Sequence, residues 1–90
     1  MHDDYKKLVA EIIKYQESII GPLAWDEAAK VGGVAAKTGQ VSITGDGKKI
    51  LESLVRQYEG LFGRASVEAC KDAIRPLLPK MKVDLPGVLL

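Results

Sequence analysis

A stripe of apolar side chains in the first quarter of the chain constrains the fold most strongly. Between residues 5 and 20, apolar residues recur every three or four positions, and most of the charged residues fall on the opposite face. Gly21 tolerates the left-handed residue that closes a helix, and Pro22 cannot continue its hydrogen-bond ladder. The pattern therefore predicts an amphipathic helix from about residue 4 to 20.

Two further helices follow from similar signals. Pro22 suits the first position of a helix over residues 22–31, which Gly32 and Gly33 end because adjacent glycines destabilise a helix. A third helix is predicted over residues 46–62, since its apolar residues recur at helical spacing and Asp46 or Thr44 precedes it as a cap.

The last predicted helix covers residues 66–78. Ser66 is its expected N-cap, and Pro76 should kink or end it. Cys70 is in phase with the apolar residues of this helix, so we interpret it as a small core residue rather than a nucleophile.

The segment between the second and third helices is ambiguous. Residues 34–43 fit a hairpin around Thr38-Gly39 that pairs Ala36 with Val41 and Val34 with Ile43 on one face. A loop fits the segment equally well, because short apolar runs discriminate poorly between states.

The sequence thus predicts a mainly α protein, a small four-helix bundle in one domain over residues 1–90, with a short β-hairpin or strand between helices 2 and 3. The predicted core consists of Leu8, Ile12, Ile19, Trp25, Leu51, Leu54, Tyr58, Leu61, Phe62, Ile74 and Leu77.

Composition limits the kinds of partner and the cellular compartment that we expect for this chain. Hydrophobic residues make up 47%, charged residues 28% and the net charge is +1, which is too weak a charge to indicate a nucleic-acid surface. The single cysteine, Cys70, excludes an internal disulfide and a cysteine-based zinc cluster. Charges within the first apolar stretch argue against a signal peptide or a membrane span. We therefore expect a cytoplasmic protein without a membrane partner.

The stretch GDGKK at residues 45–49 suggests a phosphate loop at first sight. A P-loop requires glycine at position 42 and a hydroxyl residue at position 49, where the chain has Ser42 and Lys49. A helix cap explains the stretch better, although a helix N-terminus attracts anions. The candidate anion contacts are Gly47, Lys48 and Lys49.

The tail, residues 79–90, is apolar but interrupted by proline and glycine, so it should form an irregular segment that packs in a groove. The groove belongs either to the same bundle or to a neighbour. The candidate interface residues are Val41, Ile43, Val83, Leu85, Val88, Leu89 and Leu90.

The function that these observations favour is a non-catalytic protein–protein interaction or regulatory module that self-associates, for example as a homodimer. Two alternatives remain open, a nucleic-acid-binding helix-turn-helix around residues 61–66 and a small-ligand or anion site near Asp46 to Lys49. No nucleophile, base and orienting group can be assembled, and the only histidine is His2. We therefore predict no enzymatic activity, no cofactor and no metal, and we expect no nucleic-acid partner.

Overall fold

The computed structural model describes residues 2–90, and the side chain of His2 lies outside the described part. Four α-helices and a two-stranded antiparallel sheet between the second and third of them make up most of this range, which confirms the predicted fold class. The elements are α1 (His2–Ile20), α2 (Leu23–Ala28), β1 (Val34–Lys37), β2 (Gln40–Ile43), α3 (Gly47–Phe62), α4 (Arg64–Ile74) and the short 3₁₀ helices η1 (Leu78–Lys80) and η2 (Gly87–Leu89).

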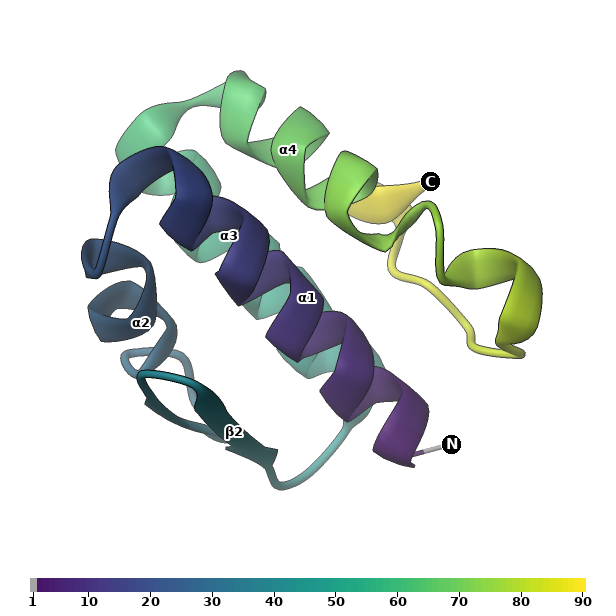
Figure 1. Cartoon of the computed structure of the whole chain (residues 1–90). Helices are drawn as coiled ribbons and strands as arrows, with labels where there is room; N and C mark the ends of the chain where they lie inside the picture. Colours follow the sequence, from purple (N-terminus) through teal and green to yellow (C-terminus); the bar gives the residue numbers. More distant parts are fainter. Residues whose placement is uncertain (1) are drawn as a thin grey trace.

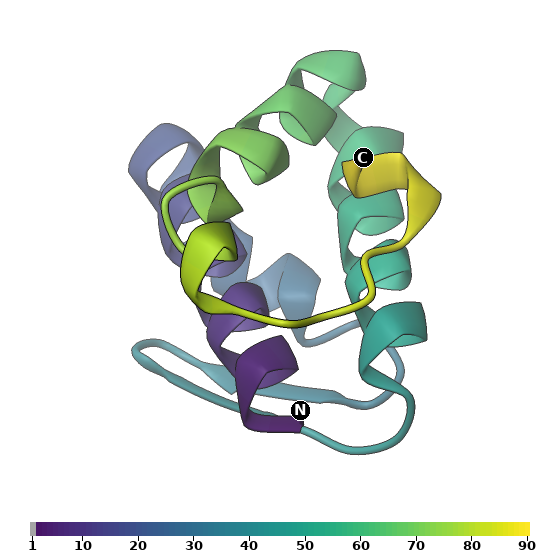
Figure 2. The same ribbon diagram turned by 90° about the vertical axis from the view of Figure 1, so that its right-hand side faces the viewer.

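Three long helices enclose the core. Helices α1 and α3 run side by side in the same direction, and α4 returns across them (Figure 1). Seen from the side in Figure 2, α1, α3 and α4 surround the interior, and the hairpin lies along one side of the bundle. The chain after α4 crosses the end of the bundle that holds the N-terminus, and η2 packs against α3 and α4.

Helix α1 forms the centre of this arrangement because it contacts all the other main elements. Leu8, Val9, Ile12 and Ile13 are fully buried, and α1 packs against α2, α3, α4 and β2. The apolar stripe predicted from the sequence is therefore the inner surface of α1 over most of its length.

The stripe prediction is wrong at the helix ends. Ile19 is 58% exposed, Leu61 51% and Phe62 38%, although the spacing of all three predicts core positions. Helical phase identifies the face of a residue, but it does not show how far along the helix that face remains covered. The last turns of α1 and α3 lie at the end of the bundle (Figure 1), and these side chains are exposed there. Leu77 is half-buried because α4 has already ended.

Helix α4 differs most from its predicted bounds. It begins at Arg64 because Gly63, with a positive φ of 77°, allows the chain to turn directly from α3 into α4. Ser66 is therefore a buried residue inside the helix rather than its cap. The helix ends at Ile74, two residues before Pro76, whose ring removes a backbone donor. None of the helices in residues 2–90 has the length and apolar character needed to cross a bilayer.

The hairpin has the predicted register. Val34 pairs with Ile43 and Ala36 with Val41. Val34 and Ile43, at the base of the hairpin, are buried, whereas Ala36 and Val41, nearer its tip, are half-buried. The base of the hairpin is thus part of the core, and its tip is only loosely covered.

Two leucines on α3 test this description of the core. Leu54 is fully buried, so Leu54→Ala should lower the free energy of unfolding by about 2 to 5 kcal/mol. Leu61→Ala removes the same atoms from an exposed site and should cost less than about 0.5 kcal/mol in the isolated chain. Urea denaturation of dilute samples measures both values, and equal losses would contradict the observed end of the core.

Candidate functional site

The start of α3 is a capped helix end. The Oδ1 atom of Asp46 accepts hydrogen bonds from the backbone N–H groups of Lys48 at 3.0 Å and Lys49 at 3.3 Å. These N–H groups are the ones that a bound anion would need. The Asp46 carboxylate already satisfies them and adds a negative charge at that point.

Gly47 serves the packing of α1 against α3. It is buried, and a Cβ atom at this position would collide with the ring of Tyr5. The Tyr5 hydroxyl donates a hydrogen bond to the backbone carbonyl of Asp84 in the tail at 2.9 Å. The glycine at position 47 is thus explained by its contact with Tyr5, a residue far away in the sequence.

The two lysines of the stretch GDGKK have different neighbours. The Nζ atom of Lys48 lies 2.9 Å from Oδ2 of Asp84, and this hydrogen bond raises the pKa of Lys48. Lys49 lies over a shallow hollow with Glu52 and Arg56 on the outer side of α3. The structure therefore does not bring Gly47, Lys48 and Lys49 together at an open surface.

Most candidate interface residues of the tail pack against the chain's own bundle. Leu89 is buried, Val83, Leu85 and Val88 are half-buried against the core, and Leu90 is exposed. In the hairpin, Ile43 is buried and Val41 is half-buried. The sequence left two places open for the tail, the bundle of its own chain and a neighbouring molecule. In the single chain the tail packs against its own bundle.

Four of the exposed large apolar side chains belong to elements that meet at the other end of the bundle. The end of α1, the start of α2 and the end of α3 meet there, at the upper left of Figure 1. The Tyr58 hydroxyl donates to the Ala24 carbonyl at 2.7 Å and so links α3 to α2, and Gln16 donates to the Ser66 carbonyl at 3.1 Å and so links α1 to α4. We call the exposed side chains Ile19, Leu23, Leu61 and Phe62 the apolar end.

Charges of both signs flank the apolar end. Glu17 on α1 and Asp26 on α2 are acidic, and Arg64 at the start of α4 is basic. Within residues 3–90, none of the three side chains forms an ion pair. They are thus free to pair with charges on another molecule.

A groove lies between α1, α2 and the hairpin. It has a volume of about 830 Å³, and its lining includes Trp25 together with Lys6, Lys14 and Lys37. The sequence pattern placed Lys6 and Lys14 on the solvated face of α1 and did not indicate the groove. The small residue Ala10 between them at four-residue spacing is the one signal that was present.

The buried polar residues link the helices. Gln57 on α3 donates to Oε1 of Glu27 on α2 at 2.8 Å, and Lys30 donates to Oε2 at 2.9 Å. The hydrogen bond from Lys30, followed by that from Gln57, lowers the pKa of Glu27.

Cys70 fits the core role that the sequence predicted. It is fully buried, and burial raises its pKa to about 11, while a hydrogen bond from Gln16 partly opposes the rise. Its thiol is therefore protonated at neutral pH, and the protonated form is a poor nucleophile.

Comparison of the chain with protein-family models, with curated proteins and with the solved structures finds no match.

A pair of glycine substitutions tests the packing explanation of the stretch GDGKK. Gly47→Ala should destabilise the protein because the new Cβ meets the Tyr5 ring. Gly60→Ala, in an open position of the same helix, should stabilise the isolated chain by about 0.5 to 1 kcal/mol. Thermal unfolding of dilute samples measures both shifts. A stable Gly47→Ala variant would show that contact with Tyr5 does not require glycine.

Acid unfolding tests the link through Glu27. Because its folded pKa is lowered, the stability that Glu27 contributes is present above its unfolded pKa of about 4.5 and is lost as the pH falls through the lower folded pKa. Glu27→Gln should therefore flatten the decrease in stability between neutral pH and about pH 3. Urea midpoints across this range measure the slope.

Asp72→Asn is the matched control for this pH experiment. Asp72 forms an exposed ion pair with Arg75 on α4, and such pairs contribute little to stability. The variant should keep the slope of the wild type. If stability falls with pH as steeply in Glu27→Gln as in the wild type, Glu27 does not contribute to acid unfolding.

Proposed function

We propose that the protein is a non-catalytic interaction module that self-associates through its apolar end. The observation that carries the proposal is the exposure of four large apolar side chains at one end of the bundle. Scattered apolar residues are normal on a protein surface, but a group of them at one place is typical of interaction sites. The first partner that the proposal names is a second copy of this chain.

The charges around the apolar end support a second copy as the partner. In a two-fold symmetric interface, each residue of one protomer meets a different residue of the same surface on the other protomer. The free acids Glu17 and Asp26 and the free base Arg64 then give complementary pairs across the symmetry axis. A surface with one sign of charge would repel its own copy.

The size of the chain also supports association. A domain of 90 residues buries a smaller fraction of its surface than a larger domain does, so it gains comparatively more from a partner. Burying Ile19, Leu23, Leu61 and Phe62 in a shared interface would extend the core beyond the end of the bundle. The buried, unpaired thiol of Cys70 supports a reducing compartment, and we propose the cytoplasm.

Light scattering over a concentration series tests self-association. The wild type should shift from monomer toward dimer as concentration rises. Ile19→Lys and Leu61→Lys should each weaken the dimer at least about tenfold, because a buried lysine without a partner opposes the interface. Both positions are exposed in the single chain, so the fold should be retained, as checked by circular dichroism.

Leu90→Lys is the matched control, because Leu90 is also an exposed leucine but belongs to the tail. This variant should associate like the wild type. A dimer that is lost with Leu90→Lys and kept with Leu61→Lys would transfer the interface to the tail. A wild type that stays monomeric at every concentration would refute self-association.

A further inference from the structure

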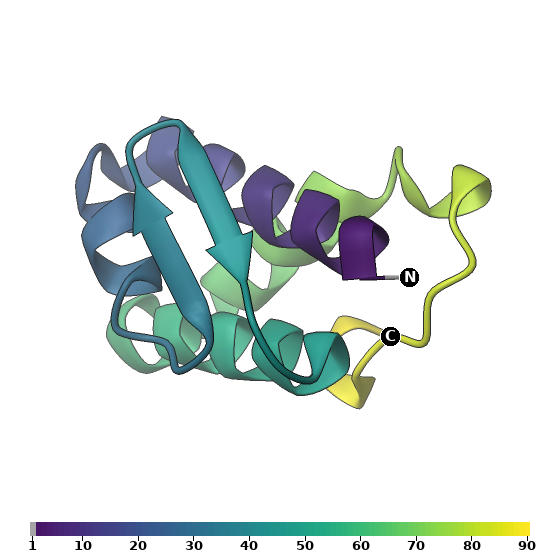
Figure 3. The same ribbon diagram turned by 90° about the horizontal axis from the view of Figure 1, so that it is seen from below.

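The groove described above lies where the hairpin overhangs the bundle. The hairpin lies along one side of the bundle beside α1 and α2, as Figures 2 and 3 show from two directions. The open groove between the hairpin, α1 and α2 has a volume of about 830 Å³, which lies in the range of small-molecule sites. It is separate from the apolar end, because its lining includes none of Ile19, Leu23, Leu61 and Phe62.

The inner wall of the groove is apolar and built from small side chains. Ala10 on α1, Ala29 directly after α2 and Ala36 on β1 line it, together with the larger side chains of Val41 and Trp25. The alanines leave room beside the tryptophan that longer side chains would fill. This wall suits an apolar body of modest size.

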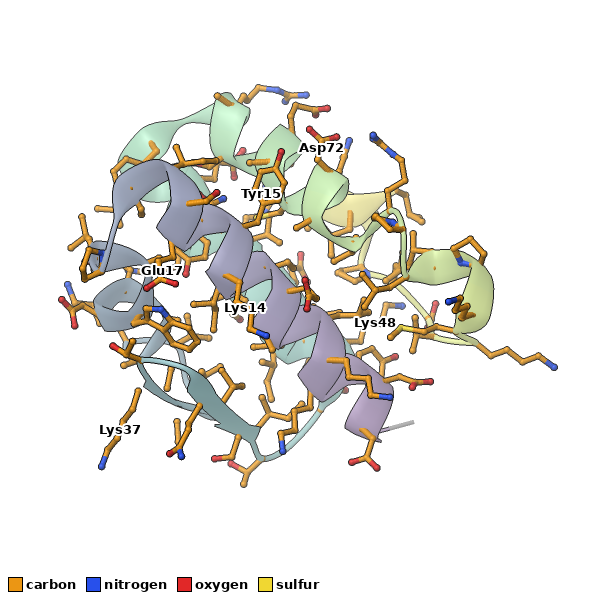
Figure 4. All side chains as sticks on the ribbon, in the orientation of Figure 1. Lys14, Tyr15, Glu17, Lys37, Lys48 and Asp72 are labelled. Carbon is orange, nitrogen blue, oxygen red and sulfur yellow. The ribbon has the colours of Figure 1, made fainter. Side chains whose placement is uncertain are left out.

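Positive charge surrounds this apolar wall. Lys6 and Lys14 stand on the α1 side and Lys37 stands on the hairpin side, and the lining of the groove contains no carboxylate. Figure 4 shows Lys14 on α1 and Lys37 on the hairpin, with the Lys37 side chain directed away from α1. In the described part of the chain, Lys6 and Lys37 form no ion pair, and Lys14 forms only an exposed one with Glu11 at 3.9 Å.

Besides Glu11, which pairs with Lys14, two acids share this face of α1: Asp3, one turn before Lys6, and Glu17, one turn beyond Lys14 (Figure 4). Glu17 does not line the groove. The groove therefore combines three cations with an apolar wall.

Trp25 provides the second, independent observation. Its side chain borders the groove and is 3% exposed, and its Nε1 atom is buried with no hydrogen-bond acceptor among the described residues. A buried donor without an acceptor destabilises the fold, so such groups are rare in folded proteins. An acceptor supplied by a bound molecule would remove this cost.

We propose that the groove binds an amphipathic organic anion, whose acidic group lies among Lys6, Lys14 and Lys37 and whose apolar body packs on the alanine wall beside Trp25. One oxygen of the acidic group accepts a hydrogen bond from the indole N–H. Each part of the ligand corresponds to one feature of the groove: charge to the lysines, apolar area to the alanines and an acceptor to the indole.

Access to the indole requires a small movement of the hairpin tip. The Nε1 atom is buried, and Ala36 and Val41, which line the groove together with Trp25, are only half-buried. A two-stranded hairpin has little stability of its own, so its tip can move while Val34 and Ile43 keep the base in the core. Binding should therefore change the surroundings of Trp25.

The experiment is a fluorescence titration with decanoate, an acid with an apolar chain, kept below its micelle concentration. Trp25 is the only tryptophan of the chain, so its emission reports on the groove alone. A saturable change in emission is expected with decanoate. Decanol, which lacks the charge, and inorganic phosphate, which lacks the apolar body, should each bind at least about tenfold more weakly.

Matched charge variants locate the site. Lys6→Gln with Lys14→Gln should weaken decanoate binding at least about tenfold, whereas Lys80→Gln with Lys82→Gln removes the same charge from the tail and should change it less than about twofold. Leu61→Lys should also leave the affinity unchanged, since the apolar end is elsewhere. Trp25→Phe, followed by calorimetry, should weaken binding about fivefold or more because the N–H donor is lost.

Any one of four results would overturn the proposal. Equal affinity for decanol and decanoate would show that the lysines do not contribute. Equal affinity for phosphate would reduce the groove to an unspecific cationic surface. The absence of any saturable change in Trp25 emission, or the same loss of binding in both lysine pairs, would show that no such site exists.

Discussion

The burial of α1 on several sides is the constraint on which the rest of the structure depends. Leu8, Val9, Ile12 and Ile13 are completely covered, and α2, α3, α4 and the hairpin each contribute to that cover. In a chain of 90 residues, covering a central helix in this way takes nearly all the other helices and strands. Two surfaces of α1 are therefore left for contact with other molecules. These are its last turn and the outer face that carries Lys6, Ala10 and Lys14.

The two ends of the bundle differ for a physical reason. At one end, the tail is held by hydrogen bonds from Tyr5 and Lys48 to Asp84, and it covers the core with Leu89. At the other end, α1, α2, α3 and α4 meet through short turns, and the described chain has no segment left to cover the last apolar side chains (Figure 1). This asymmetry directs the proposed self-association to the apolar end.

Local signals in the sequence predicted the elements well. Helical periodicity, the cap at Asp46 and the pairing of Val34 with Ile43 depend on neighbouring residues, so one sequence was enough to find them. The sequence could not show contacts between distant residues. The need for glycine at position 47 comes from Tyr5, and the exposure of Ile19 and Leu61 depends on where other helices end. For the same reason, the groove beside Trp25 could not be predicted, because it depends on how the hairpin lies over α1.

The functional account makes the apolar end the place where a second copy binds. The most direct measurement is a two-dimensional amide NMR spectrum recorded over a concentration series. Self-association through the apolar end should give concentration-dependent shifts at the end of α1, the start of α2 and the turn between α3 and α4, with the tail and hairpin unchanged. Shifts confined to residues 79–90 or to the hairpin, or spectra that do not change with concentration, would contradict it.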